Sequence, residues 1–189
     1  MKKLVVLIAA IALSFQVFAQ QEISKEEWKK MSRQERKEYK QQVAMANQQK
    51  IMQLLTSRAW VLESYQLQDK YGESVIIEPS LNFVGVAGEN ATAQLGSSGD
   101  IGWNGVGGIT VEGNIRKYDL QEGKKPGSGA YLRMEIMGVS SKNLNISIQI
   151  SADGTAAATV SDNTGDRLTY RGRIVALGES SVYKGQVVY

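Results

Sequence analysis

The pattern of hydrophobic and polar positions divides the chain into three parts. An apolar run without charged residues covers residues 4–18, and sparse apolar positions at helical spacing follow up to residue 58. From Ala59 onward, apolar and polar residues tend to alternate. A period near 3.6 indicates a helix, and a period of two indicates a β-strand with one buried face. The pattern therefore predicts a β domain at residues 59–189, preceded by a helical arm at residues 20–58.

The alternation is clearest at residues 144–151, where Leu and Ile occupy every second position. Asp153-Gly154 follows as a two-residue hairpin signal, and small apolar residues return at alternate positions from Ala156 to Val160. Further strands are expected at residues 59–68, 82–87, 91–95, 109–118, 131–138, 167–175 and 181–188. Short strands joined by turns, with no long helix between them, predict a single antiparallel β-barrel or sandwich of about eight strands.

Two capping-box sequences, at residues 24–27 and 32–35, start the helical arm. In each, a Ser is followed three residues later by a Glu, which is the pairing that closes the first turn of a helix. They predict a short helix at residues 25–31 and a longer one at residues 33–57. The first half of the arm has few apolar residues, so we expect a solvated spacer that docks on the β domain through residues 52–55.

Residues 1–19 have the organisation of a secretory signal peptide. Lys2 and Lys3 precede the apolar run, and Val17-Phe18-Ala19 places small residues before a cleavage point. The run is shorter than the roughly 20 apolar residues that a membrane-spanning helix needs. We therefore expect cleavage after Ala19 and release into the periplasm or outside the cell. A lipid anchor would require a cysteine after the run, and the chain contains none.

Composition excludes several kinds of chemistry. Neither Cys nor His occurs, which rules out disulfides, thiolate or imidazole metal sites and His-dependent catalytic triads. We therefore expect no metal and no cofactor. Loss of Lys2 and Lys3 with the signal peptide leaves 20 basic against 19 acidic residues. This near-neutral balance does not suit a nucleic-acid partner.

A glycine-rich loop at residues 99–108 is the first candidate binding site. Its one bulky aromatic residue is Trp103, with Asp100 and Asn104 close by in the sequence. A Trp ring can stack on a sugar while the two polar side chains hydrogen-bond its hydroxyl groups, so a glycan is one candidate ligand. The alternative is that Trp103 closes one end of the β core, since most Trp side chains are largely buried.

A row of arginines is the second candidate. Arg167, Arg171 and Arg173 stand at even spacing and therefore share one face of the strand predicted at residues 167–175. Guanidinium groups bind sulfate, phosphate and carboxylate groups through paired hydrogen bonds. The alternative is a solvated face that prevents pairing with other sheets.

Acidic residues offer weaker candidates. Glu112 and Glu135 lie within predicted strands, and a pair of acids at short range can hydrolyse glycosides without histidine. Cross-strand ion pairing with Arg116 or Arg133 is the favoured interpretation. Residues 162–166 are rich in oxygen ligands but lack the full ligand ladder of a calcium loop, so a hairpin turn is expected there.

The β domain resembles a known family in the order of five motifs. These are residues 80–86, 104–113, 151–156, 168–175 and 182–185, which read SLNFVGV, NGVGGITVEG, SADGTA, LTYRGRIV and VYKG. In that order they are similar to the exported Bacteroidetes proteins grouped as domain-of-unknown-function family 4251. The resemblance covers residues 59–185 and implies a small, exported, β-rich domain. It implies no activity and brings no functional residues with it.

Together these observations favour an exported, non-catalytic envelope or periplasmic domain that binds a ligand or partner. The alternatives are a carboxylate-based enzyme acting on envelope glycans and a structural protein that assembles through the helical arm. An apolar hollow inside the barrel would favour a carrier, because small barrels either fill with side chains or hold one small ligand. A polar cleft with two close acids would favour the enzyme.

Overall fold

The computed structural model describes residues 24–97, 105, 107–138 and 143–185. It contains two α-helices, α2 (Lys25–Lys30) and α3 (Arg33–Thr56), and a short 3-10 helix, Leu177–Glu179, in this part of the chain. The strands are β1 (Ala59–Gln68), β2 (Ser74–Ile76), β3 (Phe83–Ala87), β4 (Asn90–Leu95), β5 (Ile109–Glu122), β6 (Ala130–Gly138), β7 (Asn143–Ile150), β8 (Thr155–Asp162) and β9 (Arg167–Ala176). The protein is therefore mainly β with an N-terminal helical arm, as predicted.

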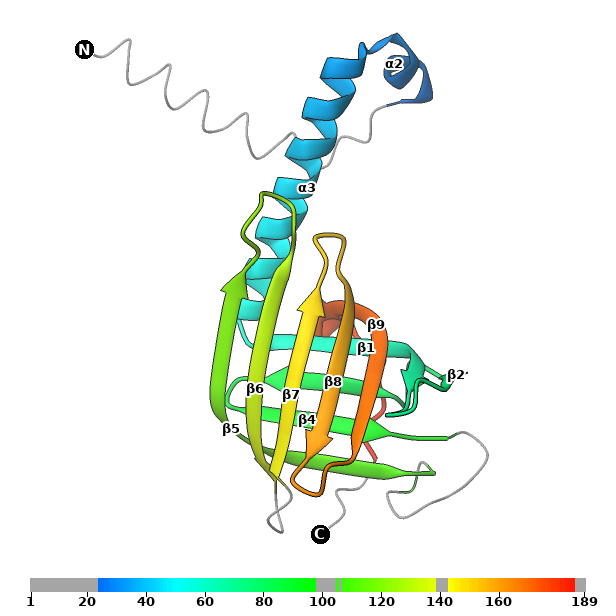
Figure 1. Ribbon diagram of the computed structural model, residues 1–189, viewed down its shortest axis with the longest axis vertical. Helices are drawn as coiled ribbons and strands as arrows, with labels where there is room; N and C mark the ends of the chain where they lie inside the picture. The colour runs from blue at the N-terminus through cyan, green and yellow to red at the C-terminus, as the bar shows by residue number, and fades with distance from the viewer. Residues whose placement is uncertain (1–23, 98–104, 106, 139–142, 186–189) are drawn as a thin grey trace, which may run out of the picture.

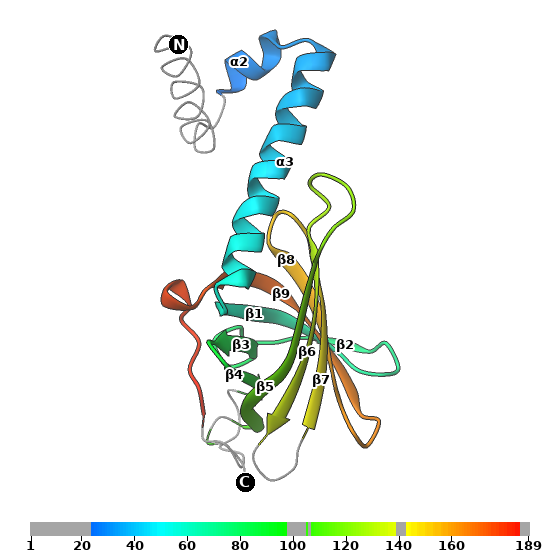
Figure 2. The ribbon, with the colours of Figure 1, turned by 90° about the vertical axis from the view of Figure 1, so that its left-hand side faces the viewer.

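The strands form a closed antiparallel barrel (Figures 1 and 2). Eight strands follow one another in the order β1, β3, β4, β5, β6, β7, β8 and β9, and β9 returns to pair with β1. The short strand β2 is an addition to the edge of β1. At the closure, a Cβ atom on Gly172 would lie 1.9 Å from the carbonyl oxygen of Glu63. Glycine is thus the residue that lets β9 approach β1 so closely.

The predicted alternation of β7 sets one wall of the core. Its four apolar side chains, Leu144, Ile146, Ile148 and Ile150, are all buried. Ile148 and Ile150 lie opposite Ala158 and Ala156 of β8. Bulky residues on one strand therefore face small ones on the next, which lets the sheet curve into a barrel without overfilling it.

The C-terminal part of α3 closes one end of the barrel, and the rest of the arm projects away from it (Figures 1 and 2). Gln48, Ile51 and Leu55 are the buried residues of this helix. They recur at helical spacing, so they lie on one stripe that faces the barrel. The docking surface is thus one turn longer than the predicted residues 52–55, and Ile51 is a main contact that the prediction left out.

The first part of the arm packs on itself. Both capping boxes are present, with Ser24 paired to Glu27 and Ser32 to Glu35. The ring of Trp28 packs edge-on against a tyrosine ring at 6.1 Å between centroids. None of the residues of α2 is buried, so this segment gains its contacts within the arm.

Two details differ from the predicted strands. Residues 181–185 were expected in a strand, but they follow an irregular path along the barrel. The amide of Tyr183 donates to the carbonyl of Ser80, and the amide of Gly185 donates to the side chain of Gln94. Pairing of β9 with β1 closes the barrel, which leaves no full-length edge for another strand. Conversely, β2 was not predicted, because three residues are too few to display an alternating pattern.

Candidate functional site

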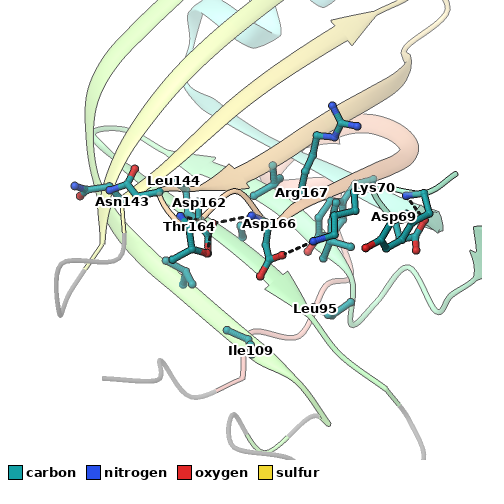
Figure 3. A pocket seen from close by; sticks show the side chains of 17 residues that line it. Asp69, Lys70, Leu95, Ile109, Asn143, Leu144, Asp162, Thr164, Asp166 and Arg167 are labelled. Atoms are coloured by element: carbon teal, nitrogen blue, oxygen red, sulfur yellow. Dashed lines mark hydrogen bonds and ion pairs between the residues drawn. The ribbon is translucent and has the colours of Figure 1, made fainter. Parts of the chain in front are cut away.

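The end of the barrel opposite α3 contains an open cavity of about 600 Å³. It is formed where β4, β7 and β8 end or begin and where the hairpins β1–β2 and β8–β9 turn. Figure 3 shows Leu144 and Asp162 along one side of this cavity and Leu95 and Ile109 facing them. The volume falls within the range of about 300–1,000 Å³ that is typical of small-molecule sites.

The walls of the cavity are mainly hydrophobic. They carry Ala93, Leu95, Ile109, Val111, Leu144, Val160 and Leu168. These side chains belong to the inward faces of the strands, which the alternating pattern assigns to the barrel interior. The cavity can therefore take up a ligand with an apolar body.

The two ends of the barrel are filled differently. Near α3, the interior is occupied by fully buried large side chains, among them Leu55, Trp60, Leu62 and Leu132. At the other end no helix docks among the described residues, and the small side chain of Ala93 contributes little volume. Among the described residues, the barrel is therefore filled at the α3 end and has an open cavity with mainly apolar walls at the other end.

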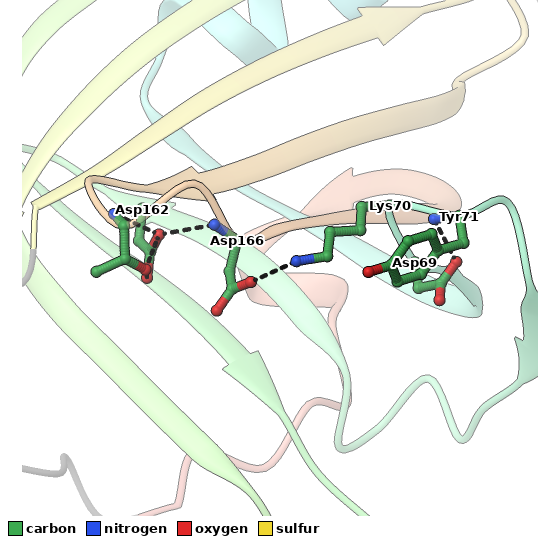
Figure 4. Close-up of polar contacts among 6 residues, drawn as sticks. Asp69, Lys70, Tyr71, Asp162 and Asp166 are labelled. Atoms are coloured by element: carbon green, nitrogen blue, oxygen red, sulfur yellow. Dashed lines mark hydrogen bonds and ion pairs between the residues drawn. The ribbon is translucent and has the colours of Figure 1, made fainter.

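The rim of the cavity is polar, and most of its groups already have partners (Figure 4). The carboxylate of Asp162 accepts hydrogen bonds from the amide and hydroxyl of Thr164 and from the amide of Asp166. The carboxylate of Asp166 pairs with Lys70 at 3.1 Å, which joins the β8–β9 turn to the β1–β2 turn. The carboxylate of Asp69 accepts the amides of two residues in its own turn.

The hydroxyl of Tyr170 and the side-chain oxygen of Asn143, both on the cavity wall, have no hydrogen-bond partner among the described residues. The hydroxyl of Tyr170 makes no hydrogen bond to any residue that the structure describes, although this side chain is only 3% exposed. Burial raises the pKa of Tyr170 well above its usual value, so the phenol is neutral at physiological pH. The side-chain oxygen of Asn143, unlike the hydroxyl of Tyr170, is fully enclosed, and it too has no partner in the described part of the chain. Unpaired buried polar groups are rare in proteins and call for an explanation.

Trp103, Asp100 and Asn104 lie outside the described residues. Their contact with a glycan stays a prediction.

The arginine row faces outward from β9, as its spacing predicted. Arg167, Arg171 and Arg173 are all exposed. Arg171 donates to the side chain of Gln68 at 3.2 Å, and Arg173 donates to the carbonyl of Asp153 at 2.8 Å. Arg167 alone of the three reaches the cavity rim, so the row as a whole lies on the outer face of the barrel rather than in the cavity.

The two candidate acids are ion-paired, but not with the predicted arginines. Glu112 pairs with Lys184 at 3.0 Å and Glu135 with Lys117 at 3.7 Å. Lys184 follows β9 by several residues, and such a long-range partner leaves no local signal in the sequence. Lys117 stands opposite Glu135 in the register, and Glu112 lies five residues earlier on β5. At about 3.4 Å per residue, five residues span about 17 Å, so the acids lie beyond the separation of about 5–9.5 Å used by glycosidases.

Residues 162–166 form the turn between β8 and β9, as expected. The Asp162 carboxylate is occupied by donors of the turn itself. No group of three or more Asp and Glu side chains in the described part of the chain is arranged to hold a metal ion. None of the helices within that part has the length and apolar character needed to cross a membrane.

Comparison with known proteins identifies the family. The model of a domain of unknown function, DUF4251, matches residues 42–174. The chain belongs to this family. The match begins within α3, so the docked half of the helix is part of the DUF4251 domain together with the barrel.

A solved structure supports the same fold. The chain is similar to a DUF4251 family protein from Bacteroides eggerthii DSM 20697, with a TM-score of 0.59 and 24% sequence identity. The similarity covers 74% of this chain and 94% of that one. Comparison with curated proteins gave no match. These findings establish the family and fold and assign no activity.

Sequence reasoning missed the cavity itself. It placed Leu144, Leu168 and Tyr170 on inward faces, which the structure confirms. Nothing in the sequence pattern assigned these three residues to a cavity. Alternation predicts that a side chain points into the barrel, whether the interior around it is filled or empty. The one available signal was Ala93, a small residue at an inward position. It indicates unfilled space only when the neighbouring side chains inside the barrel are known.

Proposed function

We propose that this DUF4251 protein is exported and that its barrel binds a small, mainly apolar ligand at the end opposite α3. The single observation that carries the binding role is the open cavity of about 600 Å³ with hydrophobic walls. Burial of apolar surface contributes about 25 cal/mol per Å². A ligand that covers these walls therefore gains affinity without any charged contact.

Export is supported by the N-terminal sequence. Lys2 and Lys3 precede an apolar run that ends in Val17-Phe18-Ala19, the arrangement of a cleavable signal peptide. The absence of cysteine is compatible with an oxidising compartment, since no thiol is available there for unwanted pairing. The proposal is therefore a periplasmic or extracellular binding domain.

Binding is tested with a neutral fluorescent probe. N-phenyl-1-naphthylamine brightens in apolar surroundings and carries no charge. We expect saturable binding to the mature protein with one site per chain. Ala93→Phe should abolish this signal, because the new ring occupies the cavity. Val160→Phe blocks the opposite wall and serves as a second variant if the first one lowers stability.

The matched control is Ala157→Phe. Ala157 lies on β8 and its neighbour in the register is the outward-facing Arg171, so its side chain does not line the cavity. Thermal unfolding of each variant shows whether it is folded. Unchanged probe binding by folded Ala93→Phe and Val160→Phe, or probe binding lost in Ala157→Phe alone, would contradict the proposed site.

Export is tested separately by mass spectrometry of the intact protein from an envelope fraction. The proposal expects a chain that begins at Gln20 or one or two residues later. A full-length cytoplasmic species as the main product would exclude it.

A further inference from the structure

We infer that the ligand is an uncharged amphiphile whose leading end carries a hydrogen-bond acceptor, a hydroxyl or carbonyl oxygen, that meets the hydroxyl of Tyr170 inside the barrel. This inference rests on the proposed binding function and narrows it to a chemical class. It excludes fatty-acid anions and other ligands that would carry a negative charge into the cavity.

The position of Tyr170 supplies the first step. Tyr170 lies three residues along β9 from Arg167 at the rim, which places it about 10 Å inward. It lines the cavity and is 3% exposed, and its hydroxyl has no partner among the described residues. The hydroxyl is also absent from the described polar atoms that are fully enclosed without a partner. Its oxygen therefore opens on to the cavity.

The second step concerns what the hydroxyl can bind. A phenol that stays protonated donates one hydrogen bond and accepts others. In an apolar cavity a donor without a partner costs free energy, and a ligand oxygen placed against it removes that cost. The ligand group that fits is therefore a neutral acceptor.

The third step excludes an anionic leading group. Lys70 and Arg167 are the only cationic side chains among the described residues that line the cavity. Lys70 is already paired with Asp166. Figure 3 shows the guanidinium group of Arg167 directed away from the side of the cavity formed by Leu95 and Ile109.

The charges of the rim act in the same direction. Among the described lining residues, three carboxylates, those of Asp69, Asp162 and Asp166, stand against the two cations. A ligand carboxylate that passed them would meet like charges. It would then lose its hydration in an apolar space where no unpaired cation of the described residues faces it, which is strongly unfavourable. An uncharged oxygen avoids both costs.

The test compares probes that share an alkyl chain and differ in the leading group. Decan-2-one accepts a hydrogen bond, decanol both accepts and donates, and decanoate carries a negative charge at pH 7.5. Their affinities are measured by displacement of N-phenyl-1-naphthylamine from the mature protein. We expect the ketone and the alcohol to bind similarly and each about tenfold more tightly than decanoate.

Tyr170→Phe identifies the hydrogen bond. The substitution removes one oxygen and keeps the ring. The variant should therefore bind the ketone and the alcohol about fivefold more weakly than the unmodified protein, which corresponds to the loss of one neutral hydrogen bond. The affinity of this variant for the naphthylamine probe is measured separately, so that displacement can be converted into affinity, and thermal unfolding shows whether the variant is folded. Tyr131→Phe is the matched control, because the hydroxyl of Tyr131 is bonded to Arg133 and does not line the cavity.

The outcomes separate this inference from the proposed function. Failure of every probe, the naphthylamine included, would overturn both. Saturable naphthylamine binding together with decanoate binding as tight as the ketone would overturn the uncharged class and leave the binding function in place. Ketone binding by Tyr170→Phe as tight as that of the unmodified protein would overturn the hydrogen bond to the Tyr170 hydroxyl and leave the binding function in place.

Discussion

The hydroxyl of Tyr118 on β5 donates a hydrogen bond of 2.6 Å to the backbone carbonyl of Leu55 near the end of α3. The same hydroxyl accepts a hydrogen bond of 3.0 Å from the indole nitrogen of Trp60 on β1. The guanidinium group of Arg58 lies over the Tyr118 ring at 4.6 Å. One phenol thus joins the helix to two strands that are not neighbours in the sheet, and the docked half of α3 is an integral part of the barrel.

We predict that Tyr118→Phe lowers the free energy of unfolding by about 1–3 kcal/mol. The substitution keeps the ring and leaves both the Trp60 indole nitrogen and the Leu55 carbonyl without their partner. Urea denaturation measures the change. Tyr131→Phe is the control, since Tyr131 is bonded to an exposed arginine on the outer surface, and it should alter stability by less than about 0.5 kcal/mol. Equal effects of the two variants would mean that the buried phenol contributes nothing specific.

The docking of α3 is predicted to depend on its buried stripe. Leu55→Ala should cost about 2–5 kcal/mol, because a fully buried leucine leaves a cavity when it is truncated. Val43→Ala, on the same helix but 39% exposed, is the matched control and should cost far less. Guanidinium unfolding followed by tryptophan fluorescence compares them. Similar losses in both variants would contradict the assignment of Leu55 to the core.

Removal of the first half of the arm should leave the barrel intact. In the described part of the arm, Trp28 contacts Tyr39, Arg36 and Lys40, which all belong to the arm itself. Deletion of residues 20–38 should therefore change the melting temperature by only a few degrees, as judged by circular dichroism. A large decrease would show that the β domain needs Trp28 or Met31 for its packing.

The strands were predictable because their signal is local. Alternation over a few residues reports which face of a strand is buried, and β7 and β9 lie within one residue of their predicted bounds. The closure between β1 and β9 was not predictable, because it joins residues more than 100 positions apart. Without it, the sequence left barrel and sandwich open and assigned a strand to residues 181–188.

The candidate site was less predictable than the fold. A cavity is the difference between the volume that a barrel encloses and the volume that its side chains fill, and both depend on the complete set of strand neighbours. The inward position of Tyr170 follows from the alternation. The lack of a partner for its hydroxyl among the described residues depends on which side chains the other strands place opposite it. No local sequence pattern contains this information.

The two buried phenols also predict how stability responds to alkaline pH. Burial is the largest cause that raises the pKa of Tyr118, and it raises the pKa of Tyr170 as well. A tyrosine of the unfolded chain ionises near pH 10, whereas these two stay protonated in the folded protein. The folded state then binds more protons than the unfolded state, so stability must fall as pH rises. This contribution is fully present below about pH 10 and is lost above it.

We therefore predict a steep loss of stability above about pH 10, measured as the urea midpoint between neutral and alkaline pH. Tyr170→Phe should flatten this loss, because the group that resists ionisation is gone, and it should change the midpoint little at neutral pH. Tyr131→Phe should not flatten it, since hydrogen bonding from Arg133 lowers the pKa of Tyr131 and gives the opposite sign. An alkaline slope that is the same in the unmodified protein and in Tyr170→Phe would show that this phenol ionises as freely in the folded barrel as in the unfolded chain.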